Sequence, residues 1–198
     1  MATNYNSIDE FKKAFRGGTR SNRFSVTATW PQNLGASNSF EMTRKTTFKI
    51  TSTSMPDATV TTIPVNYRGR KIQFAGDRQY GIWRIDVYDD SESNNLWKIF
   101  QLWMEKIDGH QSHLYADPPD YDYSSYYGKF DLNQYGLNGG SNGDILNTSG
   151  IRKITLKNVW PAAVEPINLN MADTKIVQFT VSMHFDYFTF GDDNIATL

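Results

Sequence analysis

Apolar and polar residues alternate along several stretches of this chain, which is the pattern of β-strands with one buried face. The longest alternation runs from Val177 to Tyr187, where every second residue is apolar. In Trp83–Tyr88 the same period places Trp83, Ile85 and Val87 on a face that we expect to be buried. The other extended stretches predicted are Phe24–Trp30, Ser39–Ser54, Ile63–Tyr67, Lys71–Phe74, Gly128–Gln134, Ile154–Trp160 before a closing Pro161, and Ile167–Leu169.

A short amphipathic helix is predicted near the start of the chain, over about Ile8 to Arg16. Ser7 and Glu10 have the spacing of a capping box, and Gly17-Gly18 supplies a left-handed stop. The apolar residues that share one face of this helix are Ile8, Phe11, Ala14 and Phe15. This face can lie against a sheet or a neighbouring subunit.

A second, longer helix is predicted over about Glu92 to Ile107, with carboxylate caps from Asp89-Asp90-Ser91. Its apolar stripe, which we assign to the core, consists of Leu96, Ile99, Phe100, Trp103 and Ile107. Trp97 lies off this stripe, and we assign it no function.

Turn residues separate the predicted strands. Met55-Pro56 ends one extended stretch, and Asp57–Thr62 has the composition of a loop. Arg68-Gly69 and Gly76-Asp77-Arg78 are two further predicted breaks. Longer loops are predicted over Asp108–Tyr127 and Gly136–Gly150.

These elements predict a mainly β protein, because about seven or eight strands and two helices follow one another without a βαβ rhythm. We expect an antiparallel β-barrel or sandwich with one long and one short helix, forming a single domain over residues 1–198. The chain has no cysteine, which excludes disulfides, thiolate nucleophiles and Cys-ligated metal. No signal peptide or membrane span is visible, so we expect a cytoplasmic origin.

Charge is unevenly distributed along the chain, although the net charge is only -1. Residues 1–99 hold 14 Lys and Arg against 9 Asp and Glu, whereas residues 100–198 hold 6 against 12. The basic excess between Lys12 and Arg23 allows nucleic-acid binding, but a solvated helix face explains it as well. The other interpretation is a particle with poles of opposite sign, which attract head to tail.

Candidate catalytic and metal sites are weak. His110 and His113 lie near Asp117 and Asp120, but a Pro-interrupted loop does not hold ligands in a defined geometry. We find no combination of nucleophile, base and oxyanion hole, and we expect neither an enzyme nor a cofactor. The Tyr-rich loop Tyr115–Tyr127 has two interpretations: a rim that stacks on sugars, as in a monomeric carbohydrate-binding module, or a protein interface, which we favour.

An ordered series of motifs carries a family resemblance. In chain order they are Phe48–Pro56, Ile63–Ile72, Ala75–Tyr80, Trp83, the cap Asp89-Asp90, Phe100 with Trp103, Val159-Trp160-Pro161, and Phe185-Asp186-Tyr187. This series resembles the tail tube proteins of contractile-tailed bacteriophages, and it spans most of the chain. Segments of about 33–44 and 108–125 look like insertions relative to that family.

The resemblance implies a structural subunit with a tail-tube-like fold, whose hexameric rings stack into a tube inside a contractile sheath. The implied partners are further copies of the chain, the sheath, and baseplate or terminator proteins. DNA would pass through the lumen without specific binding, and no membrane is involved. The implied location is the virion tail, after assembly in the host cytoplasm. Tubes of bacteriocin-like particles and contractile injection systems are the related alternative.

The residues that we expect to serve structure or assembly, with no catalytic, cofactor or metal role, are Pro56, Pro64, Arg68, Gly69, Arg70, Gly76, Asp77, Arg78, Trp83, Trp103 and Trp160. In the predicted turn, Gly76 provides the bend, Asp77 accepts turn amides, and Arg78 bridges to an acceptor of its own or the next subunit. Independently of the resemblance, a ring allows the free edge strands of a barrel to find partners. A strand such as 176–186, apolar on one face and polar on the other, is suited to line a channel.

Overall fold

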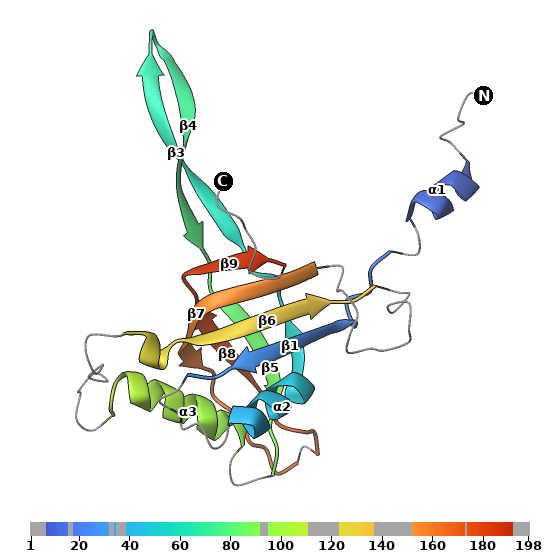
Figure 1. Cartoon of the computed structure of the whole chain (residues 1–198), viewed down its shortest axis with the longest axis vertical. Helices are drawn as coiled ribbons and strands as arrows, with labels where there is room; N and C mark the ends of the chain where they lie inside the picture. The colour runs from blue at the N-terminus through green and yellow to red at the C-terminus, as the bar shows by residue number, and fades with distance from the viewer. Residues whose placement is uncertain are drawn as a thin grey trace.

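The computed structural model describes residues 7–15, 18–31, 34, 39–91, 95–110, 123–136, 152–172 and 174–191. These residues form a body made of one folded seven-stranded sheet with helices, a projecting two-stranded arm and a helix that stands apart (Figure 1). The helices are α1 (Ile8–Phe15), α2 (Ser39–Lys49) and α3 (Leu96–Ile107), with a 3₁₀ turn, η4 (Tyr123–Tyr126). The strands are β1 (Phe24–Thr29), β2 (Ile50–Thr53), β3 (Ala58–Tyr67), β4 (Arg70–Tyr80), β5 (Trp83–Tyr88), β6 (Gly128–Gln134), β7 (Arg152–Val164), β8 (Gln178–His184) and β9 (Tyr187–Phe190).

The body is one antiparallel sheet of order β1-β6-β7-β8-β5-β2, with β9 paired to β7. β7 belongs to both halves of this sheet, because its first part pairs with β6 and its last part, from Trp160, pairs with β8. Asn158, with a φ of 55°, lies where the strand changes partner. The sheet therefore folds over on itself, which confirms the predicted mainly β antiparallel fold.

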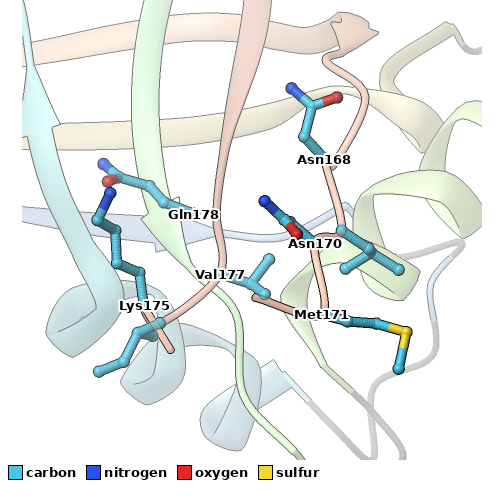
Figure 2. Close-up of a pocket in the computed structure, with 8 residues that line it drawn as sticks. Asn168, Asn170, Met171, Lys175, Val177 and Gln178 are labelled. Carbon is cyan, nitrogen blue, oxygen red and sulfur yellow. The ribbon is translucent and has the colours of Figure 1, made fainter. Parts of the chain in front are cut away.

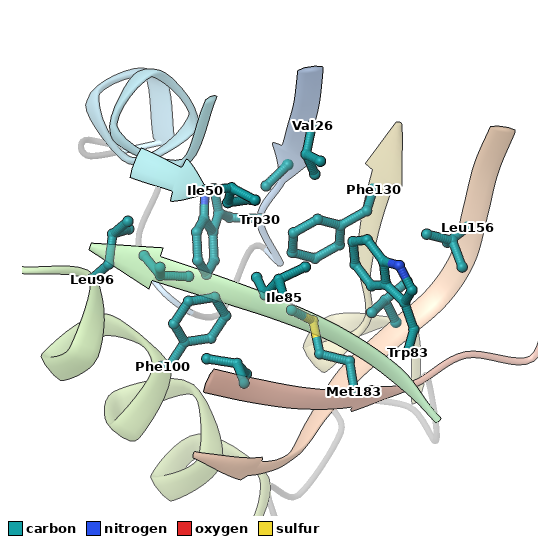
Figure 3. Close-up of a cluster of buried hydrophobic side chains, with 14 of the residues drawn as sticks. Val26, Trp30, Ile50, Trp83, Ile85, Leu96, Phe100, Phe130, Leu156 and Met183 are labelled. Atoms are coloured by element: carbon teal, nitrogen blue, oxygen red, sulfur yellow. The ribbon is translucent and has the colours of Figure 1, made fainter. Parts of the chain in front are cut away.

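The core lies between the two halves of the sheet and is closed by α3 (Figure 3). Trp83, Ile85 and Val87 are at most 1% exposed, as the alternation of β5 predicts. The predicted stripe of α3 is also confirmed at Leu96, Ile99, Phe100 and Trp103, which are all buried. The aromatic centre of the core is built by ring contacts of Trp30 with Phe100, Trp103 and Phe130.

Trp103 approaches β6 very closely at Gly128. A Cβ on residue 128 would lie 2.7 Å from the Trp103 ring and 3.2 Å from the carbonyl oxygen of Thr29. Trp103 Nε1 also donates a 2.8 Å hydrogen bond to the carbonyl oxygen of Tyr126. Gly128 is therefore required because helix and strand meet there without room for a side chain.

The strand predicted over Ser39–Ser54 is wrong for its first part, because residues 39–49 form α2. Met42 and Thr46, one helical turn apart, are buried, whereas Phe48 is 78% exposed. The threonines do not disrupt the helix, since Thr46 Oγ1 donates to the carbonyl oxygen of Met42. Residues 39–44 of the predicted insertion-like loop thus belong to this helix.

The start of the long helix also differs from the prediction. α3 begins at Leu96, and its N-cap is Asn95, whose side chain accepts a 2.9 Å hydrogen bond from Lys98 N. Asp89 and Asp90 have other roles: the Asp89 amide donates to the carbonyl oxygen of Val177, and Asp90 forms an ion pair with Lys49. These contacts hold both residues in the body before the helix begins.

The single strand predicted over Val177–Tyr187 is two strands, β8 and β9, and the alternation fails at Tyr187, which is 44% exposed. After β8, whose end pairs with β7 at Trp160, the chain is interrupted at residues 185–186 and continues along β7 as β9. The Asp186 amide donates to the carbonyl oxygen of Lys157 at this interruption. Pro161 does not close β7 but lies within it, at a register shift where its missing N–H is tolerated. The predicted strand Ile167–Leu169 has no regular structure.

Candidate assembly surface

The β3–β4 hairpin is a separate two-stranded sheet that projects from the body as a long arm (Figure 1). Tyr67 and Arg70 form its last pair, so Arg68-Gly69 is a two-residue turn. Both turn residues have positive φ, 47° and 82°, as a type I′ hairpin turn requires. The Arg68 guanidinium lies 5.3 Å from the centre of the Tyr67 ring, which holds the arginine over its own hairpin. The predicted break at Arg68-Gly69 is thus the tip of the arm.

The predicted turn at Gly76-Asp77-Arg78 is wrong, because these residues lie inside β4. The register shifts there, so Gly76 and Asp77 of β4 oppose the single residue Thr61 of β3. Thr61 Oγ1 donates a 3.0 Å hydrogen bond to the carbonyl oxygen of Asp77. A Cβ on Gly76 would lie 2.6 Å from this Thr61 hydroxyl oxygen. The glycine therefore makes room for the hydroxyl at a bulge.

The predicted loop over Asp57–Thr62 is also wrong from Ala58 onwards, where β3 begins. The first part of β3, residues 58–62, has no buried residue, and Val60 is its one large apolar residue, so its pattern does not indicate a strand. The small and polar residues of 57–62 are more typical of a loop, which explains the wrong prediction.

One face of the arm is apolar. Ile63 pairs with Phe74 and Val65 with Ile72, and directly opposed residues share a face of a sheet. This apolar arm face, which we define by its side chains, consists of Ile63, Val65, Tyr67, Ile72 and Phe74. These side chains are between 42% and 57% exposed. The opposite face carries Pro64 with Gln73 and Asn66 with Lys71. A contiguous exposed apolar patch of this kind marks an interaction surface.

The tip of the arm is basic. Arg68, Arg70 and Lys71 are adjacent there, and Arg78 lies farther down the same strand. Arg70, Lys71 and Arg78 form no ion pair with any residue that the structure describes. The arm thus presents apolar and cationic groups together.

Most of the residues predicted for assembly lie on the arm or at its root. Pro56 is at the root, and Pro64, Arg68, Gly69, Arg70, Gly76, Asp77 and Arg78 are in the hairpin. Trp83 and Trp103 are instead core residues of the body. Trp160 lies on β7 with its ring 5.0 Å from that of His184.

The helix α1 is a second exposed element, and sequence reasoning found it without showing that it stands away from the body (Figure 1). Ser7 Oγ accepts a hydrogen bond from Glu10 N, and Gly18, with a φ of 67°, donates its amide to the carbonyl oxygen of Phe15. The rings of Phe11 and Phe15 stack 5.4 Å apart. Ile8, Phe11 and Phe15 remain 73%, 64% and 57% exposed.

The outer face of β5 and β8 is polar and internally hydrogen-bonded. Thr180 Oγ1 donates to Asp86 Oδ1 at 2.7 Å, and Arg84 Nε donates to Ser182 Oγ at 3.3 Å. Because the face carries one arginine and one aspartate, its charge is balanced.

An ionic cluster joins the end of α2 to the end of β5. Lys49 forms an ion pair with Asp90, and both side chains are less than a quarter exposed. Partial burial raises the pKa of the neighbouring Asp89 carboxyl, while the Lys49 ammonium opposes this shift. The cluster holds the helix against the sheet and has no catalytic partner among the described residues.

The other candidate sites offer little chemistry. Among the described residues no group of three or more His, Asp or Glu is placed to hold a metal, and His113, Asp117 and Asp120 lie outside them. A surface hollow of about 590 Å³ is formed by the segment that connects β7 to β8 and by the start of β8 (Figure 2). The described residues that line it are mostly amide and aliphatic, and Lys175 is the one titratable group among them. No helix among the described residues is long and apolar enough to cross a bilayer.

Most of the Tyr-rich loop lies outside the described residues. The rings of its last two tyrosines, Tyr126 and Tyr127, contact each other at a tilt of 50° with their centres 4.4 Å apart, and both residues are half-buried. Neither ring is displayed as an open platform, so nothing here favours a sugar-binding rim.

A folded β-sheet body with an exposed apolar arm and an exposed amphipathic helix defines a structural protein built to associate with other chains. Residues 19–191 match the family model described as phage tail tube protein. The chain therefore belongs to the phage tail tube protein family. It is a structural tail tube subunit of the virion tail and not an enzyme.

Individual relatives agree with this assignment. Tail tube protein gp19 of Enterobacteria phage T4 is 26% identical over 183 residues, which cover 91% of this chain and 98% of the relative. The tail tube protein of Serratia phage KSP90 is 25% identical, covering 90% and 94%.

Solved structures share the fold at lower identity. The anti-feeding prophage tube terminating cap superposes with a TM-score of 0.60 at 16% identity, covering 96% of this chain and 99% of the other. The sheath–tube complex of an extracellular contractile injection system, PVC, gives 0.59 at 12% identity, covering 94% and 98%.

Proposed function

We propose that this subunit assembles into hexameric rings, that the rings stack head to tail into a tube inside a contractile sheath, and that DNA leaves through the lumen. The observation that carries the proposal is the exposed apolar arm face, because a contiguous apolar patch of this kind is suited to contact another chain. Among structural relatives, one belongs to an anti-feeding prophage baseplate solved with sixfold symmetry. Others belong to sheath–tube and terminator assemblies, which supports the sheath, baseplate and terminator as partners.

Unpaired strand edges give the subunits a second way to associate. The sheet order leaves β1 and β2 at its two ends, and β3 and β4 each have one edge free in the arm. α2 covers part of β1, where Thr43 Oγ1 donates to the carbonyl oxygen of Ala28. β9 pairs only with β7 and also has one free edge. The edges of β2, of β9 and of the arm are therefore the ones we assign to pairing with another copy.

The polar face of β5 and β8 is the face that we assign to the lumen. Its side chains are bonded to one another, as in the Thr180–Asp86 and Arg84–Ser182 pairs, and the charges of Arg84 and Asp86 balance. Because each neutralised phosphate adds affinity, a wall of balanced charge lets DNA pass without holding it. Assembly of this tube takes place in the host cytoplasm.

The proposal is tested by electron microscopy of the purified chain. We expect tubes of uniform diameter with sixfold end views. Ile72→Glu, which places a charge on the apolar arm face, should leave monomers, whereas Gln73→Glu on the opposite face should still form tubes. A wild-type chain that stays monomeric over a wide concentration range, or equal assembly by both variants, would contradict the proposal.

A further inference from the structure

The helix α1 has an apolar face and nothing of its own to cover it. A helix of eight residues is far too short to be stable in water by itself. Its Ile8, Phe11 and Phe15 side chains are nevertheless more than half exposed. A helix of this kind is stable only when its face packs on another apolar surface.

The apolar arm face matches α1 in size and shape. Eight helical residues span about 12 Å. The arm from Ile63 to Tyr67 spans about 13 Å at the rise of a β-strand. A two-stranded sheet that is apolar on one face is the kind of surface on which an amphipathic helix packs. Packing α1 on the apolar arm face would therefore cover the exposed apolar side chains of both elements.

The charges at the ends of the two elements determine a direction. Asp9 lies in the first turn of α1 and Lys12 in its last turn. The arm has Arg68, Arg70 and Lys71 at its tip, whereas towards its root Asp77 is adjacent to Arg78 and their charges balance. Opposite charges meet when the acidic first turn of the helix lies at the tip of the arm, and the basic last turn then lies away from the basic tip.

We infer that α1 of one copy packs on the apolar arm face of a second copy, with its N-terminal end at the arm's tip. Within one copy, α1 and the arm lie on different sides of the body, so the helix does not cover its own arm (Figure 1). The inference rests on the proposed self-assembly and names the element that covers the arm. Such a contact is heterologous, with a different surface on each partner, and repeating it links copies into a ring or along a stack.

The absence of cysteine makes a cross-linking test clean. Ala14→Cys, at the border of the apolar helix face, is mixed with Ile72→Cys on the apolar arm face and oxidised under assembly conditions. The matched control is Ala14→Cys with Gln73→Cys, one residue along the strand but on the opposite face. We expect at least about tenfold more disulfide-linked dimer from the first mixture.

Electron microscopy of the same samples separates the two proposals. Tubes that form in the first mixture without the disulfide-linked dimer would overturn this inference and leave the proposed function intact. Failure of all samples, wild type included, to form tubes would overturn both. A single chain carrying both Ala14→Cys and Ile72→Cys is oxidised in parallel. An internal disulfide in that chain, with no dimer from the first mixture, would assign α1 to its own arm and overturn the contact between copies.

A second measurement does not depend on oxidation. Phe11→Ala should raise the protein concentration needed for tube assembly about tenfold or more, as expected for an aromatic anchor in an interface. Lys13→Ala, on the other side of the helix, should change it less than about twofold. Equal effects of the two variants would contradict the inference.

Discussion

Nε1 of Trp83 donates a 2.8 Å hydrogen bond to the carbonyl oxygen of Ser54. Trp83 is a fully buried residue at the start of β5, and Ser54 is the residue that follows β2, just before the arm begins. The contact therefore ties the root of the exposed arm to the core. Movements of the arm are limited at this point to what a buried indole allows.

Trp83→Phe should destabilise the subunit by about 1 to 2 kcal/mol, because it removes this hydrogen bond and part of a buried ring. The free energy of unfolding from urea denaturation measures the effect. Trp97→Phe, at a tryptophan that is 37% exposed, is the control, and we expect a change below about 0.5 kcal/mol. Equal stability of the two variants would show that the Trp83 contact contributes nothing.

Asp89→Asn should alter the pH dependence of stability. Burial raises the pKa of the Asp89 carboxyl, so the folded state binds this proton more tightly than the unfolded state. Its contribution to stability is therefore fully present below the unfolded pKa, near 3.8, and is lost as pH rises through the raised folded value. The unfolding free energy of the variant, relative to wild type, should increase between pH 3 and pH 7.

Urea denaturation across this pH range measures the difference. Asp77→Asn removes an exposed carboxyl from the arm and serves as the comparison. If the Asp89 variant lost stability relative to wild type as pH rose, the sign of the burial effect would be wrong.

Arg78→Ala should weaken assembly without affecting the fold. Arg78 is exposed and forms no ion pair with the described residues of its own chain, so we expect its partner to be an acidic group of another copy. The concentration needed for assembly should rise about threefold at low salt. The effect should vanish in molar salt, where the screening length is only about 3 Å.

Sedimentation of assembled against free protein at both salt concentrations is the measurement. Lys98→Ala, an exposed lysine on α3, is the matched loss of one charge. Normal assembly of Arg78→Ala at low salt would refute the assignment.

The amides of β3 should become protected only on assembly. β3 is bonded to β4 alone, and in the free subunit its residues have few buried contacts to hold them. Hydrogen exchange should therefore be fast from Ala58 to Asn66 in the monomer and slow in the tube. β5 provides the internal reference, since it is paired on both sides by β2 and β8. Equally slow exchange of β3 in both states would rule out this order.

The uneven distribution of charge along the sequence does not produce a basic side and an acidic side of the folded body. The basic first half and the acidic second half are interleaved in the sheet, where β5 lies between β8 and β2, and β1 pairs with β6. Two poles therefore do not form in the body. The arm, which belongs wholly to the first half, keeps its basic tip because no acidic strand lies beside it.

Strands and helices with one buried face could be predicted from the sequence, because burial of one face spaces apolar residues regularly along the chain. Trp83, Ile85 and Val87 alternate because one face of β5 is in the core, and the stripe of α3 repeats because one side of the helix is covered. The end of the hairpin was also predictable, since Arg68-Gly69 is a local turn signal. The motifs that resemble the tail tube family are also short local segments, so the sequence alone was enough to recognise them.

Other features depend on which residues of a neighbouring strand lie across from a segment, and these became known only from the folded structure. The residues Gly76-Asp77-Arg78 are typical of a turn, but they lie inside β4, where Gly76 forms part of a bulge opposite Thr61. Val177–Tyr187 alternates without a break in the sequence, but the change in β7 at Asn158 divides the stretch into β8 and β9, which both pair with β7. The apolar arm face requires the register of two strands, because Ile63 and Phe74 share a face only when that register pairs them. The register between two strands depends on residues that are distant in the sequence, so it cannot be read from the spacing of residues within one strand.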